Sequence, residues 1–209
     1  MVLDKDFSIV NTEYVMKRAL AHGFTLIELL IVIAVLGILA VAVLSAINPI
    51  EQINRSRDTG SRSDAEQLLG AIDRFYATAG YYPWYTSADD DEVELAVTEV
   101  TTTTWLDNDT PQVAVLNKLS QAGTGELKGS FVTRIDDGGY NTMIVYNHGG
   151  TGESTYVCFE AKSSSFNTEA WLRCGEAVSG IGLPDDLQPA AASICIGDPA
   201  TNKNFSCLP

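Results

Sequence analysis

One uninterrupted apolar run near the N-terminus dominates the hydrophobic pattern of this chain. Residues Phe24 to Leu44 read FTLIELLIVIAVLGILAVAVL, and Glu28 is the only ionisable side chain among them. A helix rises about 1.5 Å per residue, so the run would be roughly 31 Å long, which matches the hydrocarbon core of a bilayer. The pattern therefore predicts a helix that is able to span a membrane.

A second helix with one apolar face is predicted directly after this run. Asn48, Pro49 and Glu51 form a helix-start pattern, with a capping Asn, Pro at the first helical position and Glu three residues after the cap. We therefore expect a break before Pro49 and a helix that continues to about Ala79. The stretch Asp58–Ser63 is poor in helix formers and indicates a second weak point. Apolar residues recur at helical spacing further on, at Ala65, Leu68, Leu69, Ile72 and Tyr76.

The remaining residues have the pattern of a small head with an antiparallel sheet. Residues 140–147 and 154–161 are rich in β-branched and aromatic side chains, and a Gly-rich turn at 148–153 joins them into a predicted hairpin. We expect a third short strand at 170–174 and a short helix from Thr110–Pro111 to Leu119. The sheet should lie with its apolar face on the helix around residues 65–76, which gives an α+β fold.

The charges are distributed unevenly along the chain. The formal net charge is -14, and residues 76–209 hold 6 basic and 18 acidic side chains, which gives -12 for that part alone. Nucleic-acid binding depends mainly on clustered Lys and Arg, so the head is not expected to bind nucleic acid directly. Lys118, Lys128 and Arg134 would have to gather into a cationic patch to change this expectation.

The apolar run has three competing interpretations. Lys17 and Arg18 precede it, so cationic flanking residues should stay in the cytoplasm and the rest of the chain should lie outside. The run could be a secretory signal that is cleaved after Ala40-Val41-Ala42, or a plain membrane anchor. The third interpretation starts from Glu28, because a carboxylate in an apolar helix usually has a partner. Glu28 lies one turn after Phe24, so an amine at Phe24 would be close enough to pair with it.

The residues around Glu28 carry a specific resemblance. The string GFTLIELLIVI at Gly23–Ile33, with Lys17 and Arg18 upstream, resembles the class III signal of type IV prepilins and type II secretion pseudopilins. The resemblance implies cleavage by a prepilin peptidase after Gly23 and N-methylation of Phe24. It also implies that Glu28 neutralises the N-terminal amine of a neighbouring subunit during assembly. The 23-residue leader is longer than is usual in these families, and the Pro that bends their apolar helix is missing here.

The resemblance also implies a domain organisation and a function. Residues 1–23 would be a removed leader, 24–47 a transmembrane and assembly helix, 48–79 its amphipathic continuation and 80–209 an extracytoplasmic head. The expected protein is a structural subunit of a type IV pilus-like filament for attachment, motility or uptake, with a type IV pilin-like α+β fold. Its partners would be copies of itself, the peptidase and the assembly machinery. It would lie in the cytoplasmic membrane before assembly and at the cell surface afterwards.

Two alternative functions stay open at this point. The chain could be a pseudopilin of a type II secretion or DNA-uptake system, which the sequence barely separates from a pilin. It could also be a membrane-tethered binding or enzymatic domain that uses its N-terminus only as an anchor. A mature chain that begins at Phe24 would exclude the tether. A chain that begins at Val43 would instead indicate a secretory signal.

Four cysteines lie in the predicted exported head, at Cys158, Cys174, Cys195 and Cys207. An oxidising compartment and the absence of closely spaced Cys pairs favour disulfides over a metal site. Three connectivities are possible. We expect the sequential pairing, Cys158 with Cys174 and Cys195 with Cys207, because short loops cost the least entropy to close.

The sequence offers little for catalysis. His22 lies in the leader and His148 in a Gly-rich turn, so neither a His-based triad nor a zinc site is indicated. The acidic run Asp89–Glu92 lacks the ligand spacing of a calcium loop, and Gly149–Gly152 lacks the Lys and the context of a phosphate loop. We therefore expect a non-enzymatic protein without catalytic residues, metal ligands or a cofactor.

Overall fold

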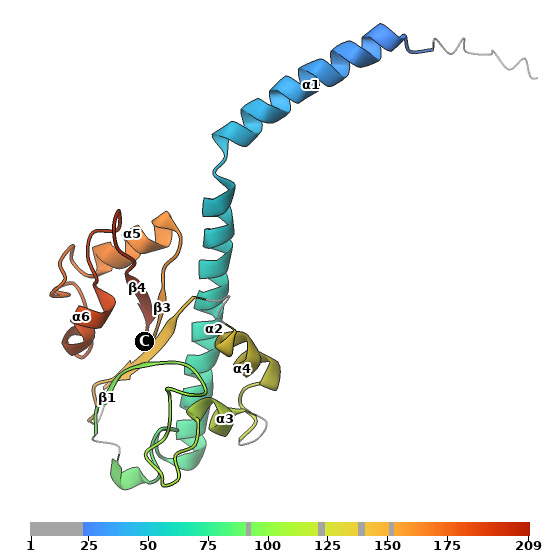
Figure 1. The fold of residues 1–209 in the computed structure, drawn as a ribbon. Coiled ribbons are helices and arrows are strands. Elements are labelled where there is room, and N and C mark those ends of the chain that lie inside the picture. The colour runs from blue at the N-terminus through green and yellow to red at the C-terminus, as the bar shows by residue number, and fades with distance from the viewer. Residues whose placement is uncertain (1–22, 91–92, 121–123, 138–140, 151–152) are drawn as a thin grey trace, which may run out of the picture. The chain divides into compact units, whose positions relative to one another are not determined.

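The computed structural model describes residues 23–90, 93–120, 124–137, 141–150 and 153–209. The chain divides into two units, Met1–Ile47 and Asn48–Pro209. Each unit is described by itself below, with elements labelled as in Figure 1.

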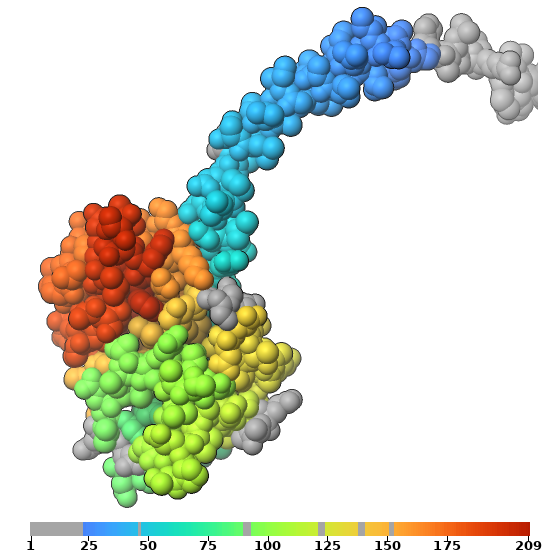
Figure 2. All heavy atoms as spheres, in the orientation of Figure 1, coloured from blue at the N-terminus to red at the C-terminus, as the bar shows by residue number. Residues whose placement is uncertain are grey.

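The first unit contains one long helix, α1, which spans Leu26–Ala46. Its interior consists almost entirely of apolar residues, and Thr25 caps its first turn. The helix ends at Ala46, and the backbone of the next residue, Ile47, is extended. Figure 2 shows the side chains of α1 at the molecular surface along the length of the helix. The large apolar side chains between Leu26 and Leu44 are each 48% to 81% exposed.

The second unit is built on helix α2, which spans Pro49–Ala79. The Asn48 side chain accepts a hydrogen bond from the Glu51 amide at 3.4 Å, and Pro49 stands at the first helical position. At the other end, Gly80 adopts a left-handed backbone with φ of 80° and donates to the Tyr76 carbonyl at 2.8 Å. The predicted helix start and end are confirmed. The predicted weak point does not interrupt α2, because the helix is continuous through Gly60.

The polar stretch of α2 is instead a docking surface for the head. Asp58 is fully buried, and its carboxylate accepts hydrogen bonds from the Ser163 amide at 2.7 Å and the Ser163 hydroxyl at 2.5 Å. The Lys162 amide and the Asn141 side-chain amide donate to the same carboxylate at 3.0 and 2.6 Å. Buried carboxylates are stable only when such donors surround them. These hydrogen bonds join α2 to residues more than 80 positions away in sequence.

The sheet has four antiparallel strands in the order β1-β2-β3-β4. The strands are β1 (Leu95–Glu99), β2 (Met143–Asn147), β3 (Thr155–Glu160) and β4 (Phe205–Leu208). The predicted hairpin corresponds to β2 and β3 and is confirmed. The two outer strands are absent from the sequence prediction, because each is stabilised by pairing with a segment that is distant in sequence.

Two predictions about the elements around the sheet are wrong. Residues 170–174 do not form a strand but lie at the end of helix α5, Ser164–Arg173, which begins where the Ser163 hydroxyl accepts from the Phe166 amide at 3.3 Å. The short helix α3 spans only Val115–Leu119 and does not begin at Thr110–Pro111. The Asp107 amide donates to the Val113 carbonyl at 2.9 Å, which closes a loop in place of the first predicted turns.

The remaining elements are short. They are α4 (Gly129–Asp136), α6 (Ala191–Ile194), and the 3₁₀ helices η1 (Ala88–Asp90) and η2 (Gln188–Ala190).

Apolar clusters cover both faces of the sheet. On one face, Val145, Val157 and Phe159 pack with Leu68 and Ile72 of α2, which confirms the prediction that the sheet lies on this helix. The other face carries a second cluster, with Ile144, Tyr146, Tyr156, Leu187 and Ile194. The sheet therefore lies between α2 and the segment that contains η2 and α6 (Figure 1).

All four cysteines form disulfides, but the predicted sequential pairing is wrong. The bonds join Cys158 to Cys207 and Cys174 to Cys195. The register of the sheet places Cys158 of β3 directly opposite Cys207 of β4, so topology overrides the preference for short loops. The loop after Cys195 is closed by Asn204 instead, which accepts from the Gly197 amide at 3.1 Å and donates to the Gly197 carbonyl at 2.9 Å.

Candidate processing and assembly segment

The predicted cleavage site lies in an accessible, non-helical segment. Gly23 and Phe24 precede the first residue of α1, and both are exposed. The Phe24 side chain is 86% exposed. A peptide bond in this setting needs no helix to be unwound before a peptidase reaches it.

Thr25 and Glu28 fix the first turn of α1 through a capping box. The Glu28 amide donates to Thr25 Oγ1 at 3.2 Å. In return, Glu28 Oε2 accepts from the Thr25 amide at 2.8 Å and from the Thr25 hydroxyl at 2.7 Å. These bonds satisfy amide groups that a helix start otherwise leaves without partners. They also hold the Glu28 carboxylate against Thr25, the residue that directly follows Phe24.

The role of Thr25 was missed by the sequence analysis. The spacing of Thr25 and Glu28 matches the capping-box pattern of Ser or Thr followed three residues later by Glu. This signal was present in the sequence, and it gives Glu28 a role in capping α1. A carboxylate has about four acceptor positions, so the two hydrogen bonds leave capacity for an amine.

Helix α1 is apolar around its whole circumference. Residues Leu26–Ser45 form a helix that is long and apolar enough to cross a membrane, with a mean hydropathy of 3.1 and no part of it buried in the protein. A helix of this kind is stable only in lipid or against other apolar helices. The capping box therefore stands at the start of a helix whose surface requires a partner outside the chain.

The comparison with protein families addresses this segment directly. The family described as the prokaryotic N-terminal methylation motif matches residues 18–44, which include the predicted cleavage site, Glu28 and α1. The chain carries a type IV pilin N-methylation signal. This signal supports the resemblance drawn from Gly23–Ile33, and it covers the apolar part of the chain rather than the head.

A curated relative extends the similarity beyond the type IV pilin signal. The chain is 38% identical over 68 residues to a protein named fimbrial protein EcpC from Eikenella corrodens. The aligned segment covers 32% of this chain and 43% of the relative. No solved structure matches the chain significantly.

Of the head side chains that the sequence singled out, His148 lies next to a tyrosine and three carboxylates. His148 lies 3.1 Å from the Tyr146 hydroxyl and lines a shallow pocket with Glu153, Asp185 and Asp186. Within the described ranges, no group of three or more His, Cys, Asp or Glu residues is placed to hold a metal ion. His22 lies outside the described residues, as do Asp91 and Glu92 of the acidic run.

Two buried tyrosines near His148 also have a structural explanation. Burial raises the pKa of Tyr156 to about 12, with a further contribution from Asp186, which accepts a hydrogen bond from the Tyr156 hydroxyl at 2.8 Å. Burial likewise raises the pKa of Tyr146 to about 12, and nearby Glu94 adds to the effect. Both phenols therefore stay neutral and act as hydrogen-bonding core residues.

Two of the three cations in the possible patch of the head, Lys118 and Arg134 but not Lys128, are paired with carboxylates in the described structure. Lys118 lies 3.4 Å from Asp107, and Arg134 lies 2.5 Å from Asp64. A cation that is already paired with a carboxylate releases little free energy on contacting a phosphate. The structure therefore adds no support for nucleic-acid binding at these side chains.

Proposed function

We propose that this protein is the structural subunit of a type IV pilus-like filament. A prepilin peptidase would cleave after Gly23, and the new N-terminal Phe24 would be methylated. The observation that carries the proposal is the combination of the type IV pilin signal with α1, an exposed helix that is apolar on all sides. The protein is proposed to be non-enzymatic and to need no cofactor.

In this proposal each part of the chain has one task. Residues 1–23 are the removed leader, and residues 24–47 anchor the precursor in the cytoplasmic membrane. Residues 48–79 continue the helical spine and carry the head, residues 80–209, on the outer side. Assembly machinery would then move the subunit from the membrane into a filament at the cell surface, where apolar helices of neighbouring copies replace lipid around α1.

Glu28 would set the axial position of each subunit in the filament. An unpaired carboxylate or amine in an apolar helix bundle is strongly unfavourable, so each copy gains most when its Glu28 lies against the amine of a neighbour. The capping box supports this role, because it holds the carboxylate at the N-terminal end of α1. Processing removes the residues that precede Phe24 and exposes the amine there.

The pilus subunit is favoured over a pseudopilin because the curated relative is a fimbrial protein. A role in a DNA-uptake system gains no support from the head, where Lys118 and Arg134 are paired with carboxylates. Protein secretion remains the second proposal, since a pseudopilin would use the same signal and the same helix.

N-terminal mass spectrometry of filaments sheared from the cell surface tests the proposal. The expected mature chain begins with N-methylated Phe24. A chain that begins at Met1 would support a membrane tether instead, and one that begins at Val43 would support a cleaved secretory signal. A chain that begins at Phe24 but is recovered only from the membrane fraction would favour the pseudopilin.

A further inference from the structure

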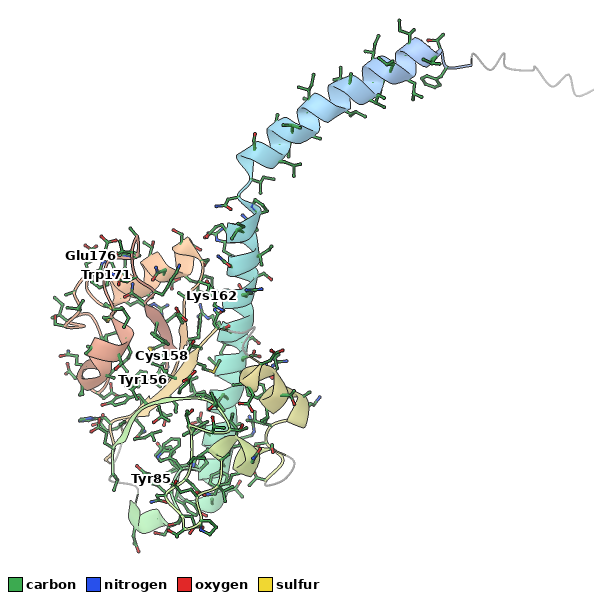
Figure 3. All side chains as sticks on the ribbon, viewed as in Figure 1. Tyr85, Tyr156, Cys158, Lys162, Trp171 and Glu176 are labelled. Atoms are coloured by element: carbon green, nitrogen blue, oxygen red, sulfur yellow. A yellow bond between two sulfur atoms is a disulfide. The ribbon has the colours of Figure 1, made fainter. Side chains whose placement is uncertain are left out.

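A shallow pocket lies at the end of the second unit where α2 stops. Its volume is about 260 Å³, and its lining comes from Tyr81, Thr86, Asp107, Asp109, Val113 and Lys118. Tyr81 follows directly on the last turn of α2, and Lys118 belongs to α3. Figure 3 labels the neighbouring Tyr85, which marks this end of the unit.

The walls of this pocket are held by a partly buried ion pair between Asp107 and Lys118. Asp107 is only 3% exposed, and its carboxylate accepts a hydrogen bond from the Val113 amide at 2.7 Å. The other carboxylate oxygen lies 3.4 Å from the Lys118 ammonium, which also donates to the Tyr85 carbonyl at 2.9 Å. Because Asp107 ties the loop to α3, the pocket is formed before any ligand arrives.

The lining combines charged, polar and apolar side chains with the aromatic ring of Tyr81. The Lys118 ammonium donates to two acceptors and lies 5.8 Å from the centres of both the Phe75 and the Tyr81 rings. The exposed Asp109 uses Oδ1 to accept from the Thr110 amide at 2.7 Å. The Tyr81 phenol is able to donate and accept, and Val113 adds an apolar wall.

Charge decides which class of ligand fits these groups. An anion would face Asp107 and Asp109, and the single cation is already paired with Asp107. Lys118 balances the charge of Asp107, so a cation would be attracted only by the exposed Asp109. A neutral molecule with several hydroxyl groups can donate to that carboxylate without the desolvation cost of an ion, and the apolar face of a sugar ring suits an aromatic side chain.

We propose that this pocket binds a neutral carbohydrate. The position of the pocket agrees with the outward display of the head. Helix α2 has 31 residues, so the pocket lies roughly 46 Å along the helix from Pro49, where the second unit begins. This inference goes beyond filament assembly and does not depend on it, because the site lies within the second unit.

Saturation-transfer difference NMR on the full chain tests the proposal. The protein is purified in a detergent without a sugar headgroup, such as a polyoxyethylene ether, since a maltoside would occupy the same site. The probes are the methyl glycosides of galactose, glucose and mannose, together with acetate and choline as charged comparisons. At least one glycoside should receive saturation, and its transfer should exceed that to either charged probe.

Three variants locate the site. Asp109→Ala and Tyr81→Leu should each weaken binding of the glycoside about tenfold, through loss of a charged hydrogen-bond acceptor and of the ring. Asp73→Ala removes an exposed carboxylate on α2 and should leave binding unchanged. Circular dichroism and the buried tryptophans report whether Tyr81→Leu still folds, while the exposed Asp109 tests the pocket without disturbing the core.

Several results would overturn the proposal. One is the absence of transfer to all three glycosides in the wild-type chain. Another is equal transfer in the wild-type and Asp109→Ala chains, which would place the sugar elsewhere. Stronger transfer to acetate or choline would show that the pocket selects a charged ligand.

Discussion

Helices α1 and α2 follow one another in the chain but bury their surfaces in different ways. In α1 the large apolar side chains are exposed on all sides. In α2 one face is buried against the head, first through Asp58, Ser61 and Asp64 and then through apolar residues such as Leu68 and Ile72. The comparison shows that a helix apolar all round needs a partner outside its own chain, whereas an amphipathic helix finds its partner within it.

The first way to sharpen this comparison is to remove the charge at the start of α1. Glu28→Ala should leave the precursor inserted in the membrane and abolish filaments, because the amine of Phe24 would then enter the assembly without its partner. The yield of sheared filaments and the membrane-bound fraction are measured together.

Glu66→Ala is the matched control for this prediction. Glu66 is exposed on α2 and pairs with Arg62, four residues earlier, at 3.5 Å. Its loss should leave filament yield unchanged. Normal filaments from Glu28→Ala would refute the role given to this carboxylate.

Truncation of one leucine in each helix tests the contrast in burial. Leu68→Ala should lower the free energy of unfolding of the head by about 2 to 5 kcal/mol, because Leu68 is fully buried. Leu36→Ala, at a side chain that is 58% exposed, should leave the free energy of unfolding of the head unchanged. Urea denaturation followed by the fluorescence of the buried Trp84 and Trp105 gives both values. Equal effects from the two variants would contradict the division between the helices.

A substitution in the polar half of the α2 interface should have a smaller effect on the free energy of unfolding. Asp58→Ala would leave the amides of Lys162 and Ser163 without their acceptor and should lower the free energy of unfolding by about 1 to 3 kcal/mol. Hydrogen exchange should also rise at both amides. Asp73→Ala, on the exposed face of the same helix, should change stability by less than about 0.5 kcal/mol. If Asp58→Ala changes stability as little as Asp73→Ala does, the packing of α2 on the head depends on its apolar residues alone.

The smallest expected effect is a pH dependence of the free energy of unfolding that comes from Asp64. Burial raises the pKa of Asp64 above its ordinary value of 3.8, and the Arg134 guanidinium offsets this only in part. Since the pKa is raised in the folded state, protonation favours folding. This contribution is fully present below pH 3.8 and is lost as pH rises through the raised pKa.

The measurement compares wild type with Asp64→Asn in urea denaturation between about pH 3 and pH 6. The wild-type chain should lose stability relative to the variant as the pH rises in this range. A difference between the two chains that stays constant with pH would contradict the raised pKa.

Much of the helical part could be predicted because its signals lie in neighbouring residues. The Asn48–Pro49 start and the Gly80 stop of α2 are local, and the structure has both. The β2–β3 hairpin was equally local. Strands β1 and β4 were missed because each is stabilised by pairing with a distant segment rather than by its own composition. The strand predicted at 170–174 was wrong because the Ser163 cap, a few residues upstream, begins a helix there.

The candidate sites likewise divide into features set by neighbouring residues and features set by contacts between distant segments. Gly23, Phe24 and Glu28 form one contiguous motif, so the sequence by itself determined the type IV pilin signal and the membrane-length helix. Only the tertiary structure decided the disulfide pairing, the burial of Asp58 and the pocket around Lys118. Those features depend on which distant segments meet, because a strand register or a buried acceptor is defined by contacts that no local pattern contains.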